Sequence, residues 1–201
     1  MINEIGLFKE EFGDEPQKRL VQAVYTTCHE AARYAYAAMP DFAASVIPSL
    51  RRYLLEQEIQ NGAWGPTLRV SIKAGHNCSY CLLESPRVAL TVVTRSEPAS
   101  FVEPYRYRET LAQPAQQELF SRGGELRAAE KLYALLQYGG SASSRDPQFV
   151  RICFPTVDGS MAPGVVDLLS DHAEFVASIA NVGVVPEPEV RISLTRKPKE
   201  A

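Results

Sequence analysis

Apolar residues recur with the period of an α-helix through the first third of the chain. Between residues 14 and 39 they fall every three or four positions, which predicts one long helix with a single apolar seam. Asp14 stands at the expected N-cap, Gln17 follows at capping-box spacing, and Pro40 ends the helix. The second half of the seam consists of small residues that allow another helix to approach closely, namely Ala31, Ala35 and Ala38.

A shorter helix precedes this one and a further helix follows it. The first has its apolar residues between positions 5 and 12 and is terminated by Gly13. The further helix is expected to begin near Pro48 and to end at Gly62. Residues 1–62 are therefore expected to form a helical N-terminal part.

The hydrophobic period then changes from helical to alternating. From Leu68 to Ile72 every second residue is apolar, which indicates a half-buried strand. A turn at 75–77 and a returning strand at 78–83 complete a hairpin. The segment 88–94 is apolar on both faces, which is typical of a central strand. The pattern predicts an antiparallel meander over residues 66–95.

Helical and extended patterns alternate irregularly in the second half of the chain. Two helices are expected first, one over 115–122 and one with Leu126, Ala129, Tyr133 and Leu136 on one face. A buried strand over Phe149–Phe154 and a turn-rich connection over 156–164 follow. The chain is then expected to form a helix carrying Val165, Leu168, His172, Phe175 and Ile179, a strand over Val190–Leu194, and a charged tail over 195–201. This irregular order favours the α+β class. We predict a single domain over 1–201, with an antiparallel or mixed sheet of about five strands and helices packed mainly on one face.

Composition limits the classes of function. The net charge of -3 and the pI of about 5.7 argue against binding nucleic acid or a membrane by bulk charge. The longest apolar runs are strand-sized, and the N-terminal residues lack the apolar core of a signal peptide. Four cysteines without an export signal read as reduced thiols, which predicts a cytoplasmic, bacterial-type protein.

The cluster His76, Cys78 and Cys81 holds three metal-type ligands within six residues. Two cysteines at this spacing can reach one zinc ion from a tight turn, but a structural site needs a fourth ligand. No second Cys-x-x-Cys exists in the sequence, and Cys28, His29, Cys153 or His172 would have to supply that ligand from far away. On a regular strand Cys78 and Cys81 point to opposite faces. We therefore predict a structural, metal-free cysteine pair and no cofactor.

Two helical patterns contain residue types that occur in catalytic sites. Cys28-His29-Glu30 resembles the start of a metalloprotease helix, but Arg33 occupies the position of the second histidine, so this reading is rejected. Asp167, Asp171 and Glu174 form an acidic line that can bind a divalent cation or simply face solvent. A metal-dependent hydrolase or nuclease using such carboxylates is the alternative function.

The segment 96–113 has no hydrophobic period and contains two prolines, and a connection of this length is usually functional or disordered. Aromatic and guanidinium side chains of the kind that anchor partner interfaces are concentrated in it: Phe101, Tyr105, Arg106, Tyr107 and Arg108. Residues 66–112 hold six basic and four acidic residues, in contrast to the acidic remainder. Exposed arginines here should tolerate alanine within about ±0.5 kcal/mol each.

These observations predict a binding or regulatory protein whose partner contacts the segment 96–113. The overall acidity favours a protein partner over nucleic acid, and no membrane partner is expected. The sequence carries no phosphate loop, dinucleotide-binding pattern or nucleophile elbow.

Overall fold

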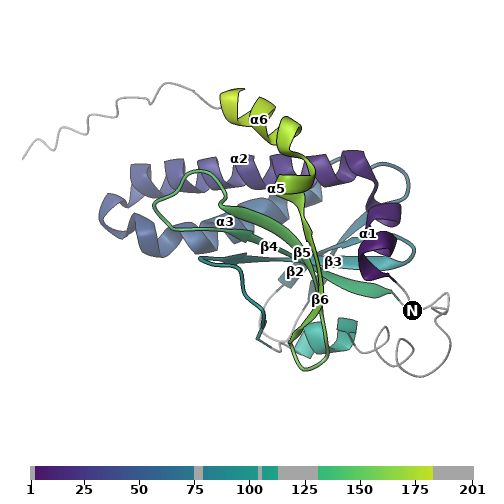
Figure 1. Ribbon diagram of the computed structural model, residues 1–201. Coiled ribbons are helices and arrows are strands. Elements are labelled where there is room, and N and C mark those ends of the chain that lie inside the picture. Colours follow the sequence, from purple (N-terminus) through teal and green to yellow (C-terminus); the bar gives the residue numbers. More distant parts are fainter. Residues whose placement is uncertain (1–2, 75–78, 104–105, 113–130, 183–201) are drawn as a thin grey trace, which may run out of the picture.

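The computed structural model describes residues 3–74, 79–103, 106–112 and 131–182. They form one α+β domain built on a six-stranded mixed sheet in the order β1-β2-β3-β4-β5-β6. The long helices lie along one face of this sheet, as Figure 1 shows. The expected fold class and the packing of helices mainly on one face are confirmed, with one strand more than expected.

The first two helices meet at Gly13. Helix α1 (Glu4–Phe12) ends there, and α2 (Asp14–Ala38) begins at the next residue. Gly13 has φ 55, in the left-handed region that favours glycine, so the chain changes direction within one residue. The expected N-cap at Asp14 is wrong, because Asp14 is the first helical residue and Gly13 occupies the cap position. The Gln17 side chain donates a 2.8 Å hydrogen bond to the Gly13 carbonyl instead of closing a capping box.

Helix α3 (Ala43–Asn61) starts five residues before the expected Pro48, after a 3₁₀ turn, η1 (Pro40–Phe42). Pro48 lies inside the helix and removes one of its backbone hydrogen bonds. The preceding turn is nevertheless helical because Ala43 and Ile47 are fully buried against Ala35 of α2. The small-residue seam on α2 thus receives α3, as the sequence predicts.

The sheet contains the expected meander and one parallel pair. Its strands are β1 (Arg69–Ala74), β2 (Ser79–Glu84), β3 (Val88–Arg95), β4 (Leu132–Gly139), β5 (Phe149–Pro155) and β6 (Met161–Asp167). Strands β1, β2 and β3 pair antiparallel, which confirms the meander, and β3 lies in the interior of the sheet. Strand β3 pairs with β4 in parallel, and every other pairing is antiparallel.

The main core lies between the sheet and the helices. Alternate residues of β3 and β4, such as Leu90 and Leu136, face it together with α2 and α3. On α1, Phe8 stacks on Phe12 at 4.6 Å between ring centroids and meets Phe154 of β5 edge-on at 6.4 Å. Helix α1 thereby packs over the β5 side of the sheet.

The helix expected through Tyr133 and Leu136 is wrong, because these residues belong to β4. Every residue of β4 is buried, so the strand is apolar on both faces and shows no alternation. A short apolar run of this kind fits the helical and the extended template equally well. Its parallel pairing with β3 and antiparallel pairing with β5 decide for the strand.

The region 161–182 also differs from the expectation. Residues expected in a turn form most of β6, whose Pro163 and Gly164 are atypical of strands. The expected single helix is divided into α5 (Leu168–Asp171) and α6 (Ala173–Val182). His172 separates them with a non-helical backbone, and its buried ring lies with Nδ1 3.4 Å from Asp14 Oδ1.

Several expected elements lie outside the described residues: the turn at 75–77, the helix over 115–122, the strand over Val190–Leu194 and the tail over 195–201. Within the described ranges, no helix is long and apolar enough to cross a membrane.

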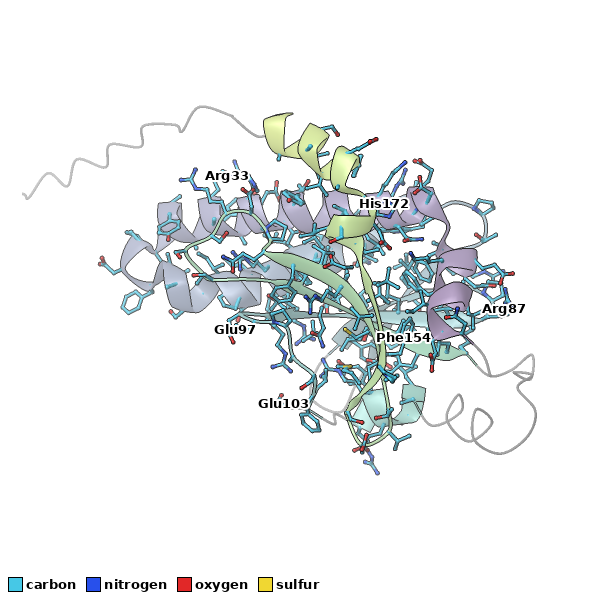
Figure 2. The ribbon with its side chains drawn as sticks, in the orientation of Figure 1. Arg33, Arg87, Glu97, Glu103, Phe154 and His172 are labelled. Atoms are coloured by element: carbon cyan, nitrogen blue, oxygen red, sulfur yellow. The ribbon has the colours of Figure 1, made fainter. Side chains whose placement is uncertain are left out.

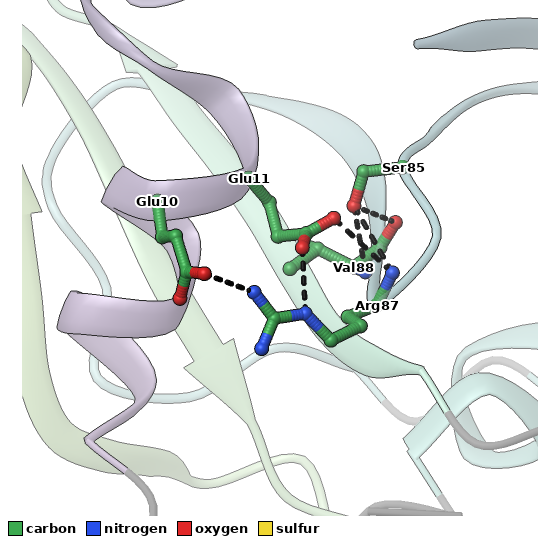
Figure 3. A network of polar contacts seen from close by, with 5 residues as sticks. All are labelled: Glu10, Glu11, Ser85, Arg87 and Val88. Atoms are coloured by element: carbon green, nitrogen blue, oxygen red, sulfur yellow. Dashed lines mark hydrogen bonds and ion pairs between the residues drawn. The ribbon is translucent and has the colours of Figure 1, made fainter. Parts of the chain in front are cut away.

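A polar network fastens α1 to the turn between β2 and β3 (Figure 3). The Arg87 guanidinium contacts Glu10 and Glu11, each at 2.6 Å. Burial raises the pKa of Glu11, but hydrogen bonds from Ser85 and Arg87 outweigh it, and the net pKa is lowered. Glu11 is therefore ionised at neutral pH, and the network serves the fold.

Candidate binding surface

The chain crosses the second face of the sheet directly after β3. We call residues 96–103 and 106–112 the strap. Gln137 of β4 points away from the helical core and holds the strap at Ala99 by two hydrogen bonds. The Ala99 N–H donates to Gln137 Oε1 at 3.2 Å, and Gln137 Nε2 donates to the Ala99 carbonyl at 3.0 Å. Because Gln137 is fully buried, this pairing satisfies an amide that has no access to water. Figure 2 shows the strap residues Glu97 and Glu103 on the side of the sheet opposite His172.

The middle of the strap pairs with the turn between β5 and β6. Phe101 forms an antiparallel bridge with Ser160. The Val102 N–H donates to the Gly159 carbonyl at 2.9 Å, and the Met161 N–H donates to the Ser100 carbonyl at 3.2 Å. The backbone of the strap is therefore fixed at this point by the hydrogen-bond pattern of a short extra strand.

The end of the strap is helical over residues 106–112, although the sequence shows no hydrophobic period there. Tyr107 stacks on Tyr80 of β2 at 4.1 Å between ring centroids. Arg108 is only 7% exposed, and its Nη1 donates to the Glu103 carbonyl at 3.2 Å. Burial raises the pKa of Tyr133 strongly, and the hydrogen bonds from Thr91 and Arg108 oppose that rise. Arg108 therefore reaches β4 beneath the sheet.

The five predicted binding residues separate into two groups. Phe101 is 51% exposed and Arg106 is exposed, whereas Tyr107 is half-buried and Arg108 is buried. Tyr105 lies outside the described residues. The expectation that Arg108 faces solvent is wrong, because two residues along a helix point about 200° apart, by the 3.6-residue turn. The arrangement presents Phe101 and Arg106 to a partner and uses Tyr107 and Arg108 to attach the strap.

A shallow hollow of about 390 Å³ lies on the turn beside Phe101 and is lined by Thr156, Val157, Asp158 and Ser160. Asp158 Oδ1 accepts hydrogen bonds from the Thr156 hydroxyl and from the Ser160 hydroxyl and N–H, the last two at 2.8 Å and 3.1 Å. These bonds lower the pKa of Asp158, so the carboxylate stays ionised and held in one orientation.

The turn and the aromatic ring are in direct contact through Gly159. A Cβ atom at this position would lie 3.1 Å from the Phe101 ring and 2.4 Å from the Val102 carbonyl oxygen. A larger residue at 159 would therefore displace the strap. The surface thus combines the exposed ring of Phe101, the oriented carboxylate of Asp158 and the hollow. Hydrogen bonds between the strap and the turn hold the backbone that carries them.

Two further arginines lie on the second face of the sheet, Arg95 at the end of β3 and Arg151 on β5. Both are half-buried, and the Nε atom of each is buried with no hydrogen-bond partner within the described part of the chain. The strand register puts both residues on the same face, since Arg95 is opposite Gly139 and Gly139 is opposite Phe149. These cations lie on the same side of the sheet as the carboxylates of Glu97 and Glu103, so both signs of charge are present there.

The described cysteines are not in the thiolate form that nucleophilic catalysis or metal binding requires. Cys28, Cys81 and Cys153 are buried and unbonded, and burial raises the pKa of each thiol to about 11. They are therefore protonated at neutral pH. His76 and Cys78 lie outside the described residues, so the expected metal-free pair remains a prediction. Among the residues that the structure describes, no group of three or more His, Cys, Asp or Glu is placed to hold a metal ion.

The acidic line of the alternative function is divided among three elements. Asp167 ends β6 and caps α5, where its Oδ1 accepts from the N–H groups of Leu169 and Ser170. Asp171 forms an ion pair with Lys9 at 2.7 Å. Glu174 is exposed in the first turn of α6. Two of the three carboxylates thus take part in contacts that stabilise the fold.

No protein-family model, no curated protein and no solved structure matches this chain.

Proposed function

We propose that the protein is a non-catalytic binding protein that holds a segment of another protein on the surface around Phe101. The observation that carries this proposal is the exposed ring of Phe101 on a backbone paired with Ser160. A large aromatic side chain loses little conformational entropy on binding when its backbone is already fixed, and such residues are frequent anchors of interfaces. The ring packs on the turn at Gly159 with one side and leaves the other side open to a partner.

The chemistry of the surface favours a particular partner. An apolar side chain of the partner enters the hollow beside the ring. A basic side chain pairs with the ionised Asp158 and can lie over the Phe101 face, since cations are attracted to aromatic faces. The same carboxylate repels phosphate groups, so a protein segment fits this surface better than nucleic acid. Arg106, exposed on the strap, supplies a contact for an acidic residue at the rim.

The proposed compartment is a reducing cytoplasm of the bacterial type. The three described cysteines are buried thiols on separate elements, α2, β2 and β5, which supports this placement.

Site-specific photo-crosslinking in cells tests the proposed surface. A photoreactive phenylalanine analogue at position 101 should give a discrete crosslinked protein. The same analogue at Ile72, which is 47% exposed on β1, is the matched control and should not. Asp158→Asn should weaken the product at position 101. Because Asp158 also accepts hydrogen bonds from Thr156 and Ser160, the melting temperature of the variant is measured as well, to separate a loss of the contact from a loss of the fold. Equal labelling from positions 72 and 101 would refute the proposal.

A further inference from the structure

Exposed apolar side chains are concentrated on one part of the molecule, the hairpin formed by α2 and α3. Of the eight large hydrophobic residues exposed in the described chain, five lie on it: Tyr34, Tyr36, Met39, Phe42 and Tyr53. Four of these surround the connection between the two helices, and Phe42 there is 68% exposed. We call residues 34–50 the hairpin tip. It contains a single charged residue, Asp41, in a chain of which 22% is charged.

The main core of the protein does not contain these side chains. The tip has its own small apolar cluster of Ala35, Ala43 and Ile47, with Leu50 packed against it, separate from the main core. Figure 1 shows this end of α2 and α3 extending beyond the sheet. The small residues hold the two helices together and leave the aromatic rings outside. An exposed apolar area of this kind usually marks an interaction surface.

We propose that the hairpin tip is a self-association surface and that its occupant is the hairpin tip of a second copy of this chain. The four large side chains are each about half exposed, so with about 150–250 Å² for an aromatic residue they offer roughly 400 Å² of apolar area per copy. A stable interface buries about 800 Å² per partner. The neighbouring small residues Ala37, Ala38, Ala44 and Ser45 are exposed and extend the area. The dimer is therefore weak, in the micromolar range.

Charge does not oppose the approach of a second copy. A two-fold interface brings the same patch together from both chains, so any charge in the patch meets its own kind. Here the like charges amount to Asp41 alone, whereas the chain as a whole has a net charge of -3. The tip carries one carboxylate, and the Arg33 guanidinium beside it lies 4.7 Å from the centre of the Tyr34 ring, so this surface has no excess of positive charge to attract anionic lipid. It also offers a charged partner few groups to pair with.

Sedimentation analysis of the full chain over a range of about 1–200 μM tests the inference, since weak dimers populate across it. The wild type should show a monomer–dimer equilibrium that changes little between low and high salt. The double variant Tyr36→Ser, Phe42→Ser should weaken it at least about 10-fold, because exposed aromatic anchors carry most of such an interface. Tyr53→Ser is the matched control: Tyr53 is 64% exposed on α3 and lies outside the tip, three residues beyond Leu50.

A wild type that stays monomeric at every concentration would overturn the inference, as would equal weakening by the control variant. Binding of neutral lipid vesicles by the wild type, lost in the double variant without any dimer, would assign the tip to a membrane and would also overturn it. Circular dichroism of each variant checks that the helices are intact. The outcome is independent of the proposed partner site, because crosslinking from position 101 should be unchanged in the double variant.

Discussion

Arg106 and Arg108 are two residues apart on the strap, and the structure predicts opposite consequences of removing them. Arg108→Ala deletes a buried stem of three methylene groups, which contributes about 0.8 kcal/mol for each group. It also removes hydrogen bonds from a charged donor to the Glu103 carbonyl and to Tyr133. Bonds of this kind contribute about 1.5–3 kcal/mol each, and part of that is recovered through water. We expect a loss of about 3–4 kcal/mol.

Arg106→Ala is the matched control, since the residue type, the substitution and the helix are the same and only the exposure differs. Its stability should change by less than about 0.5 kcal/mol. Urea unfolding, followed by circular dichroism, measures both variants, and the midpoint at constant slope gives the difference in unfolding free energy. If Arg108→Ala unfolds at the wild-type midpoint, the strap is not attached to the sheet through this side chain. A lowered slope for Arg108→Ala alone would indicate that the strap is released in the native state.

Three further substitutions check other parts of the structure by the same measurement. Ala35→Leu should cost about 1–3 kcal/mol by overpacking the contact of α2 with α3, whereas Ala37→Leu, exposed on the same helix, should be nearly neutral. Gly139→Ala should cost more than about 2 kcal/mol, because φ is 138 and the new Cβ would lie 2.2 Å from a carbonyl oxygen of β3. The pKa of Glu11 is lowered below its ordinary 4.5, so its stabilising effect is present above that pH and is lost as the pH falls through the folded-state value. Glu11→Gln should therefore remove part of the acid dependence of stability, and an unchanged acid profile would contradict the role of its contact with Arg87.

Hydrophobic periodicity predicts the helices and strands that bury one face. It does not identify a strand that is buried on both faces. The apolar seam of α2 recurs every three or four residues and is buried, so the period identifies this helix. Apolar and polar residues alternate in β1, and the strand is present, although Ile72 on its apolar face is 47% exposed. Strand β4 is buried throughout, and its residues fit a helix as well as a strand. Its identity depends on β3 and β5, which no local pattern contains.

The candidate site shows the same limit. The composition of the segment 96–113 drew attention to it, but its direction relative to the sheet depends on Gln137 and Ser160, which come later in the chain. The strap helix is about two turns long and buries an arginine, so it has no apolar seam to detect. The hairpin tip is not predicted from the sequence, because the exposure of its aromatic residues depends on how α2 and α3 pack.

The parallel pairing of β3 with β4 has a consequence for how the chain folds during synthesis. The paired residues of β3 and β4, such as Val88 and Leu132, are separated by the whole connection, or crossover, between the two strands. Forming this pair therefore costs more loop entropy than forming any hairpin of the sheet. The ribosome releases the helices and the meander first, with the apolar edge of β3 unpaired until β4 emerges. Nascent chains halted inside the crossover should therefore expose this edge and bind chaperones, and chains extended past β5 should not.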